Sequence, residues 1–316
     1  MLLTFLLLQS ETCRGPIGLQ IFQDTESEKK DDNSEVIPSP CSLPIVYNQV
    51  SSSASDVQKQ SEQLDDSAGS LNLDVRLGRW DSRKLFKSFD AALVGSQYSE
   101  LSDKSKVCLA TQSSLEKLHS LVQVVHQWQG PISMGLYVSG DEEFEVAQKY
   151  LEFMQRCYSS VRERVVFSIL VPKNRVPKQQ PRYYPLPDFL DCEKPEGTLH
   201  QLTRSISTEQ TSWRVRNAYP QNHMRNLARK NCQTEYVFLT DVDIVPCTNL
   251  SQLLEEFLKD DNCDKCAYVV PTFELDTRVR FPQNKSELVR LAKKGLARPF
   301  HQKVFIHNQF ATNFTR

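Results

Sequence analysis

The sequence lacks a charge excess of either sign and a long apolar run, and its first 75 residues contain few aromatic side chains. The 316 residues include 38 Lys and Arg against 39 Asp and Glu, for a formal net charge of −1. Proteins that wrap nucleic acid carry a strong basic excess instead. No run approaches the ~20 apolar residues that span a bilayer as a helix. We therefore expect no nucleic-acid partner, and the composition excludes a polytopic membrane protein.

Two segments precede the part with globular composition. The first, residues 1–8, is a short apolar leader containing LLTFLLL, with no basic residue ahead of it. It is interpreted either as a remnant signal anchor or signal peptide, or as a chance apolar start. The second, residues 9–75, is rich in Ser, Asp, Glu, Lys and Gln. It cannot bury enough apolar surface to offset the entropy of ordering its backbone, so we expect a disordered stem there and a folded domain over 76–316.

The cysteines and glycosylation motifs do not decide whether the protein belongs to the secretory pathway. Nine cysteines are an odd number for a fully disulfide-bonded secreted chain. Cys263-Asp-Lys-Cys266 has CxxC spacing, but no second CxxC and no nearby His pair completes a zinc site. A local disulfide or two free thiols is therefore favoured over a metal or redox role. N-x-[ST] sequons stand at Asn249, Asn284 and Asn313, which are candidate glycosylation sites in a secretory-pathway protein.

From Lys106 onward, short apolar runs alternate with helical periodicity. The pattern predicts strands at 107–110, 132–138, 165–171, 236–240 and 267–270, and helices at 115–129, 141–157, 222–230 and 250–259. Residues 111–114 resemble a helix N-cap cluster, and the Pro-rich segment 172–208 is predicted to be a loop. Apolar strands that alternate with helices predict an α/β fold with a parallel sheet covered on both faces. Ligands of such sheets bind beyond the carboxyl ends of the strands, so Thr111-Gln112-Ser113 is a candidate nucleotide-binding edge.

The sequence Asp241-Val242-Asp243 follows the predicted strand at 236–240. Alternate residues of an extended segment share a face, so both carboxylates can point the same way. Two adjacent carboxylates repel each other unless a cation or a proton lies between them. A hard divalent cation takes carboxylate and phosphate oxygens as ligands. The pattern is typical of nucleotide-sugar transferases, where the cation stabilises the leaving diphosphate; a solvated acidic pair at a strand end is the alternative.

A basic helix is predicted directly upstream of the two aspartates. Arg225 and Arg229 lie one helical turn apart on it, and guanidinium groups suit diphosphate oxygens. Two solvated arginines on an amphipathic helix fit the same spacing. The spacing alone does not separate these interpretations.

Several longer stretches carry a more specific pattern. They are Tyr219–Arg229, Tyr236–Pro246, Val269–Glu274, Phe281–Leu288, Arg298–Phe300, Ala311–Arg316, and the pair 106–110 and 128–131. Together they resemble the beta-1,4-glucuronyltransferase branch of glycosyltransferase family 49, from about residue 76 to the end. The resemblance implies a GT-A fold, that is, a Rossmann-like nucleotide-sugar transferase fold. It also implies Mn²⁺ as the cofactor and UDP-glucuronate as the donor.

The resemblance implies further properties of the reaction and the site. The reaction would be inverting, with glucuronate placed in β-1,4 linkage on a xylose of the O-mannosyl glycan of α-dystroglycan-type glycoproteins. Family members are type II Golgi membrane proteins with a lumenal catalytic domain. Carried over onto this sequence, the metal ligands would be Asp241 and Asp243, and the donor-binding residues would be Thr111, Asn222, Arg225 and Arg229.

Two departures from the family affect these expectations. The leader is shorter than the family's transmembrane anchor, and the family continues well beyond the position of Arg316. We expect a metal-binding His and the catalytic base, which an inverting transferase needs, in that later part, so the GT-A domain is expected to be incomplete here. The rival interpretations are a LARGE-type xylosyl/glucuronyl or an N-acetylglucosaminyl transferase of the family, and a non-catalytic Golgi module that binds a partner transferase or a glycan.

Overall fold

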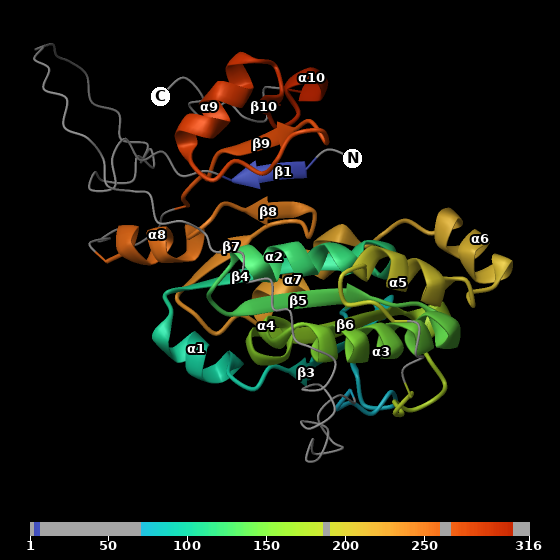
Figure 1. Ribbon diagram of the computed structural model, residues 1–316. Coiled ribbons are helices and arrows are strands. Elements are labelled where there is room, and N and C mark those ends of the chain that lie inside the picture. The colour runs from blue at the N-terminus through green and yellow to red at the C-terminus, as the bar shows by residue number, and fades with distance from the viewer. Residues whose placement is uncertain (1–2, 7–70, 186–189, 260–266, 306–316) are drawn as a thin grey trace, which may run out of the picture. The chain divides into compact units, whose positions relative to one another are not determined.

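The computed structural model describes residues 3–6, 71–185, 190–259 and 267–305 (Figure 1). The remainder of the leader, nearly all of the expected stem, the Cys263/Cys266 pair and Asn313 lie outside the described residues. Leu71 and Val75 are buried in the main hydrophobic core. The folded region therefore includes these residues, which lie ahead of the expected boundary at 76.

A six-stranded sheet forms the centre of the fold, in the order β2-β3-β6-β5-β4-β7. Its strands are β2 (Arg79–Trp80), β3 (Phe86–Val94), β4 (Val107–Ser114), β5 (Ile132–Tyr137), β6 (Val165–Pro172) and β7 (Tyr236–Leu239). The four strands from β6 to β7 in this order pair in parallel, and β2 and β3 pair antiparallel at the other edge. The predicted α/β fold is thus confirmed, with a mixed and mostly parallel central sheet.

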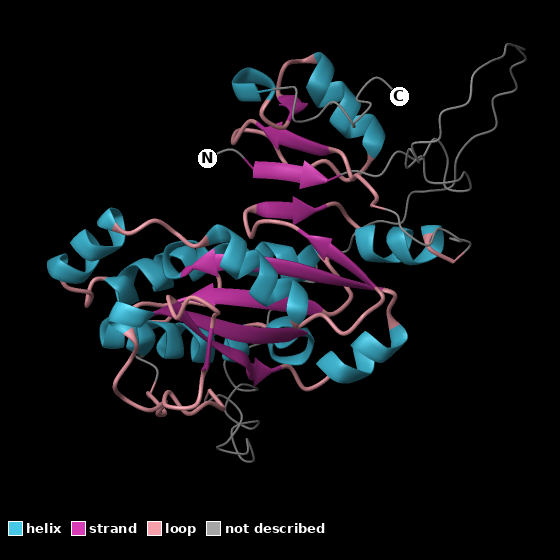
Figure 2. Cartoon of the chain, turned by 180° about the vertical axis from the view of Figure 1, so that it is seen from behind, coloured by secondary structure: helices cyan, strands magenta, loops and turns pink. Residues whose placement is uncertain are grey.

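Helices cover both faces of this sheet (Figure 2). The helices in this part of the chain are α1 (Tyr98–Lys104), η2 (Leu115–Ser120), α2 (Leu121–Gln127), α3 (Gly140–Cys157), α4 (Ser159–Arg164), η3 (Lys173–Arg175), α5 (Pro195–Thr203), α6 (Thr208–Arg216), α7 (Gln221–Lys230) and α8 (Leu250–Phe257). Helix α7 packs so closely on β5 that a Cβ on Gly135 would lie 3.2 Å from atoms of Met224. On this face Tyr137, Leu170, Met224 and Leu227 form a small core of their own.

The structure corrects three sequence predictions, two at the end of β4 and one in the Pro-rich segment 172–208. Residues 111–114 belong to β4, which continues through Ser114 and pairs with β5 along this whole stretch. Ser114 occupies the N-cap position of η2, but its side chain makes no capping hydrogen bond. The following helix begins as a 3₁₀ turn, η2. The predicted loop 172–208 contains η3 and α5, whose Pro195 starts a helix because its fixed φ suits the first turn.

A second, four-stranded sheet has the order β10-β9-β1-β8. It consists of β10 (Ala297–Pro299), β9 (Thr272–Leu275), β1 (Leu3–Leu6) and β8 (Ile244–Pro246), and α9 (Lys285–Lys293) and α10 (Gln302–Phe305) accompany it. The strand predicted at 267–270 is wrong: the strand begins after Pro271, which has no N–H for a ladder bond. Part of the apolar leader forms β1, parallel to β8 and antiparallel to β9; its interpretation as an anchor remnant stays a prediction. Within the described part of the chain, no helix has the length and apolar character needed to cross a bilayer.

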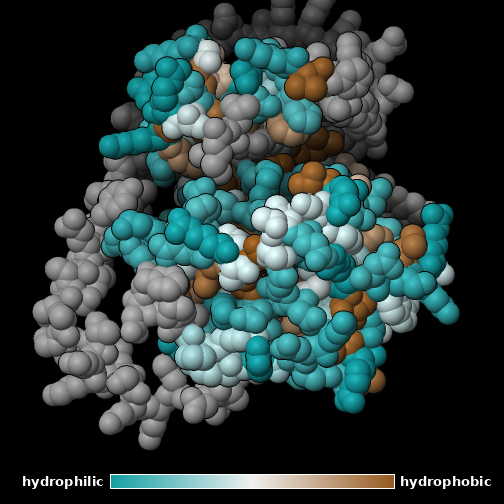
Figure 3. Space-filling view, turned by 90° about the vertical axis from the view of Figure 1, so that its right-hand side faces the viewer, coloured by the Kyte–Doolittle hydropathy of each residue, from teal (hydrophilic) through white to brown (hydrophobic). Residues whose placement is uncertain are grey.

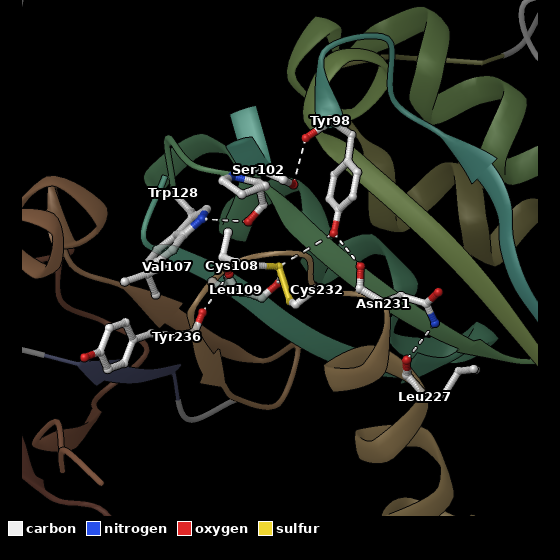
Figure 4. Close-up of a disulfide and its surroundings, with 12 residues drawn as sticks. Tyr98, Ser102, Val107, Cys108, Leu109, Trp128, Leu227, Asn231, Cys232 and Tyr236 are labelled. Carbon is white, nitrogen blue, oxygen red and sulfur yellow. Dashed lines mark hydrogen bonds between the residues drawn. A yellow bond between two sulfur atoms is a disulfide. The ribbon is translucent and has the colours of Figure 1, made fainter. Parts of the chain in front are cut away.

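Two disulfides tie distant segments of the fold together. Cys108 in β4 bonds to Cys232, just after α7, and Cys157 at the end of α3 bonds to Cys192. Figure 4 shows the first of these beside Tyr98, whose hydroxyl donates to the carbonyl of Asn231 at 2.7 Å. The first disulfide thus fixes the central strand β4 to the end of helix α7.

Candidate functional site

Asp241, Val242 and Asp243 lie in the turn that connects β7 to β8. The backbone N–H of Ile244 donates to the carbonyl of Asp241 at 2.9 Å, which closes a four-residue turn. The expectation of an extended segment is therefore wrong, although its consequence holds. Val242 is 2% exposed, whereas the two aspartate side chains are about one third exposed. Burial of the valine turns both carboxylates outward.

Both carboxylates line one pocket of about 550 Å³ at the carboxyl end of β4. In Figure 1 the parallel strands run toward the side on which α5 and α6 lie, and this is where ligands of such sheets bind. Figure 3 views that side and shows a mostly hydrophilic face with hydrophobic residues in small separate groups. The polar and charged residues of the pocket that bear on its chemistry include Gln112, Glu116, Lys117, Arg214, Tyr219, Asp241 and Asp243.

Asp241 is held by two side chains from different elements. The amide nitrogen of Gln112 in β4 donates to its Oδ1 at 2.8 Å. A guanidinium nitrogen of Arg225 in α7 donates to both carboxylate oxygens, at 3.0 and 3.2 Å. Gln112 is in turn fixed by Tyr219, whose hydroxyl donates to its amide oxygen. Burial raises the pKa of Tyr219 above its ordinary value, so the hydroxyl keeps the proton that it donates.

Among the described residues, the cationic partner of Asp243 is a lysine, Lys117. The Nζ of Lys117 lies 2.8 Å from its Oδ2, and the lysine side chain is 62% exposed. Asp241 is therefore fixed by a rigid, partly buried network, while Asp243 is paired with a flexible side chain. Gln112 lies in β4 and Lys117 in η2, which directly follows it, so two consecutive elements supply partners for both aspartates.

The donor set fits part of a divalent-cation site. Asp241 and Asp243 supply hard carboxylate oxygens to one pocket, and their repulsion is offset by Arg225 and Lys117. Across the described residues, no group of three or more His, Cys, Asp or Glu side chains forms a complete metal site. Two protein ligands suffice where phosphate oxygens and water complete the shell, as they usually do for Mg²⁺-type cations.

A buried ion pair supports the wall of the pocket. Glu143 in α3 and Arg214 in α6 pair with side chains only 4% and 13% exposed. Glu143 also accepts from the amide of Gln210 at 2.7 Å, and from the N–H of Ser139 at 2.9 Å. The guanidinium of Arg214 stacks on the ring of Tyr137 at 4.5 Å. This cluster holds α6 against the start of α3.

Replacing Glu143 with glutamine is expected to lower the free energy of unfolding by about 3 kcal/mol. The amide keeps the size of the side chain but removes the buried counter-ion of Arg214 and leaves only the more exposed Glu116, 3.7 Å away; breaking a buried pair costs about 3–5 kcal/mol in proteins. Urea unfolding followed by circular dichroism measures the change. Glu142→Gln is the control. Glu142 directly precedes Glu143, is exposed and accepts hydrogen bonds from Ser207, so its substitution should change the free energy of unfolding by less than about 1 kcal/mol. Equal effects of both substitutions would contradict the role of the buried pair.

The structure brings some predicted site residues together and leaves others apart. Asp241, Asp243 and Arg225 meet at the pocket, Arg225 through its contact with Asp241. Thr111 is fully buried and does not line the pocket; its neighbour Gln112 is the residue that reaches Asp241. Asn222 and Arg229 lie on exposed positions of α7 outside the pocket lining.

The two described sequons lie on the surface. Asn249 is exposed ahead of α8 with a left-handed φ of 62°. Asn284 is exposed and caps α9, where its Oδ1 accepts from the N–H of Glu287 at 2.9 Å. Asn313 lies outside the described residues. Glycosylation of these positions stays a prediction.

Four side chains that act at or behind the pocket were not singled out from the sequence as site residues. They are Lys117, Glu143, Arg214 and Tyr219. Gln112 stood within the candidate nucleotide-binding edge, and Tyr219 opens one of the stretches with a family resemblance. Lys117, Glu143 and Arg214 gave no signal, because each is one charged residue of an amphipathic segment until the fold supplies its partner.

Comparisons with known proteins place the site in a family context. A family described as "Glycosyl-transferase for dystroglycan", family 49, matches residues 106–316. Beta-1,4-glucuronyltransferase 1 of Homo sapiens is 31% identical over 219 residues, which cover 68% of this chain and 51% of the relative. Xylosyl- and glucuronyltransferase LARGE1 of Homo sapiens is 26% identical over 264 residues, 83% of this chain and 28% of the relative. The chain thus spans about half the length of the glucuronyltransferases it matches. With the matched region covering both the Asp-Val-Asp turn and β4, this chain belongs to glycosyltransferase family 49.

Proposed function

We propose that the protein is a metal-dependent inverting glucuronyltransferase that uses UDP-glucuronate as donor. The proposed acceptor is a xylose of an O-mannosyl glycan on an α-dystroglycan-type glycoprotein, and the proposed linkage is β-1,4. The observation that carries the proposal is the pocket in which Asp241 and Asp243 present two carboxylates beside cationic side chains. Glucuronyl transfer is common to the names of both kinds of relative, whereas xylosyl transfer appears only in the LARGE names.

Within this proposal, each residue has a defined task. Asp241 and Asp243 would hold Mn²⁺, which supplies Lewis-acid stabilisation of negative charge on the leaving diphosphate. Gln112 and Arg225 fix the orientation of Asp241 through direct hydrogen bonds. Tyr219 fixes Gln112, so the carboxylate is held in place before a ligand arrives. Preorganisation of this kind avoids a reorganisation cost during the reaction.

A lumenal Golgi location, with a type II membrane anchor, is part of the proposal. The two disulfides support an oxidising compartment, because disulfides persist in the secretory pathway and are rare in the cytosol. The exposed sequons at Asn249 and Asn284 are compatible with the same compartment.

Donor selection tests the proposed function. The protein, purified together with the later part of the family's domain in which the catalytic base is expected, is incubated with Mn²⁺, a xylose-terminated acceptor and, separately, UDP-glucuronate, UDP-xylose or UDP-N-acetylglucosamine, and released UDP is measured. We expect release from UDP-glucuronate to exceed release from the other two by at least about tenfold, the discrimination expected when a charged substrate group has a dedicated partner. Preference for UDP-xylose would favour a LARGE-type activity instead. Absence of Mn²⁺-dependent UDP binding in calorimetry would contradict both and favour a binding module.

A further inference from the structure

The ion pair between Lys117 and Asp243 places a mobile cation on a carboxylate that the proposed function requires for a metal. Its Nζ lies 2.8 Å from Oδ2, and the two side chains are 62% and 36% exposed. The partners are 126 residues apart in sequence, so the pair does not follow from local helix spacing. The fold itself brings η2 to the turn between β7 and β8.

This pair cannot stay unchanged when a divalent cation binds. A hard cation takes carboxylate oxygens at about 2–2.6 Å, and an ammonium hydrogen-bonded to the same small group would repel it. Lys117 can leave, since its side chain is flexible and mostly exposed. Arg225 is held in place more firmly than Lys117, because it contacts both oxygens of Asp241 and comes from the well-packed helix α7.

Once released, the ammonium still lies in the pocket. Lys117 and Asp243 line the same cavity as Gln112 at the carboxyl end of β4. A nucleotide diphosphate held beside the aspartates would therefore place its negative oxygens within reach of a cation that has lost its partner. An ammonium paired with a phosphate forms a charge-assisted hydrogen bond, which is stronger than a neutral one.

We propose that Lys117 exchanges partners, pairing with Asp243 in the free site and with the donor's diphosphate once a divalent cation occupies the aspartates. This inference rests on the proposed function, because it requires a cation and a nucleotide at this pocket. Each of the two ligands has to break the same ion pair, so the first to bind meets the cost and the second does not. Lys117 therefore makes the binding of cation and nucleotide positively cooperative, and by linkage the effect is reciprocal.

The test compares Lys117→Met with the unmodified 316-residue chain. Binding of Mn²⁺ without nucleotide is measured from the electron paramagnetic resonance signal of the free ion, and binding of UDP with and without Mn²⁺ by calorimetry. We expect Mn²⁺ alone to bind about two- to fivefold more tightly, the range spanned by exposed ion pairs. We expect UDP in the presence of Mn²⁺ to bind about tenfold more weakly, as for the loss of one hydrogen bond between charged groups. Lys117→Arg should restore most of the UDP affinity.

Two controls distinguish this exchange from misfolding and from the mere loss of a surface charge. Lys104→Met removes an equally exposed lysine, 68% exposed and paired with Glu100 on α1, and should change neither affinity. Misfolding would weaken the binding of both Mn²⁺ and UDP. The exchange instead predicts a higher affinity for Mn²⁺ alone and a lower affinity for UDP in the presence of Mn²⁺. An Mn²⁺ affinity that is unchanged or weaker in Lys117→Met, or an unchanged UDP affinity, overturns the exchange. An unmodified chain that shows no Mn²⁺-dependent UDP binding overturns the proposed function itself.

Discussion

Replacing Asp241 with asparagine is expected to reduce turnover of UDP-glucuronate, and UDP affinity in the presence of Mn²⁺, by about 100- to 1,000-fold. The substitution removes one of the two carboxylates of the Asp-Val-Asp turn, both of which line the pocket, and electrostatic stabilisation by a bound cation contributes several kcal/mol to such reactions. Steady-state kinetics and calorimetry with UDP and Mn²⁺ measure the two losses. Asp243→Asn should give a loss of similar size, because its carboxylate lines the same pocket.

The fold should survive this substitution. The side chain of Asp241 is 32% exposed, and the amide oxygen of asparagine can still accept from Gln112 at the position of Oδ1. The free energy of unfolding is therefore expected to change by less than about 1 kcal/mol. Asp276→Asn is the matched control: its carboxylate is 28% exposed and pairs with an arginine, Arg278, but does not line the pocket. If Asp241→Asn retains the UDP affinity of the unmodified chain, the two aspartates are not the cation site.

The elements around this site differ in how far the sequence could predict them. Strands β5 and β6 are mostly apolar runs, each interrupted by one serine, so the hydrophobic pattern located them closely. Strand β4 was predicted too short, because its last residues, Thr111 to Ser114, are polar and resemble a helix cap. They stay in the strand because β5 supplies a partner along the whole stretch, and pairing between strands is invisible to local propensity.

The candidate site shows the same contrast between features that a local sequence pattern predicts and features that depend on tertiary contacts. Two carboxylates separated by one apolar residue are a local pattern, and Asp241 and Asp243 were predicted from it. The residues that fix them come from elsewhere in the chain, Gln112 at 129 positions before Asp241 and Lys117 at 126 before Asp243. Neither position carries a charge pattern or a spacing that would reveal such a contact. The local sequence pattern therefore predicted the two candidate ligands, and the fold had to supply their partners.

Removing the disulfide between Cys108 and Cys232 is expected to lower the free energy of unfolding by about 4–5 kcal/mol. The bond closes a long loop, because the two cysteines are 124 positions apart, and the chain entropy it removes from the unfolded state grows with loop length. Both sulfurs are replaced in Cys108→Ala/Cys232→Ala, since a single substitution would leave a reactive thiol. Urea unfolding under oxidising conditions measures the loss.

The second disulfide supplies the internal comparison for this prediction. Cys157 and Cys192 are 35 positions apart, so Cys157→Ala/Cys192→Ala should cost about 1 kcal/mol less under the same dependence on loop length. Only the first disulfide joins β4, which carries Gln112, to the end of α7, which carries Arg225. Its removal should therefore also weaken Mn²⁺-dependent UDP binding, whereas removal of the second should leave that affinity within about twofold, the effect of a substitution remote from the site. Equal losses of UDP affinity in both variants would show that the first disulfide stabilises the fold without holding the candidate site in place.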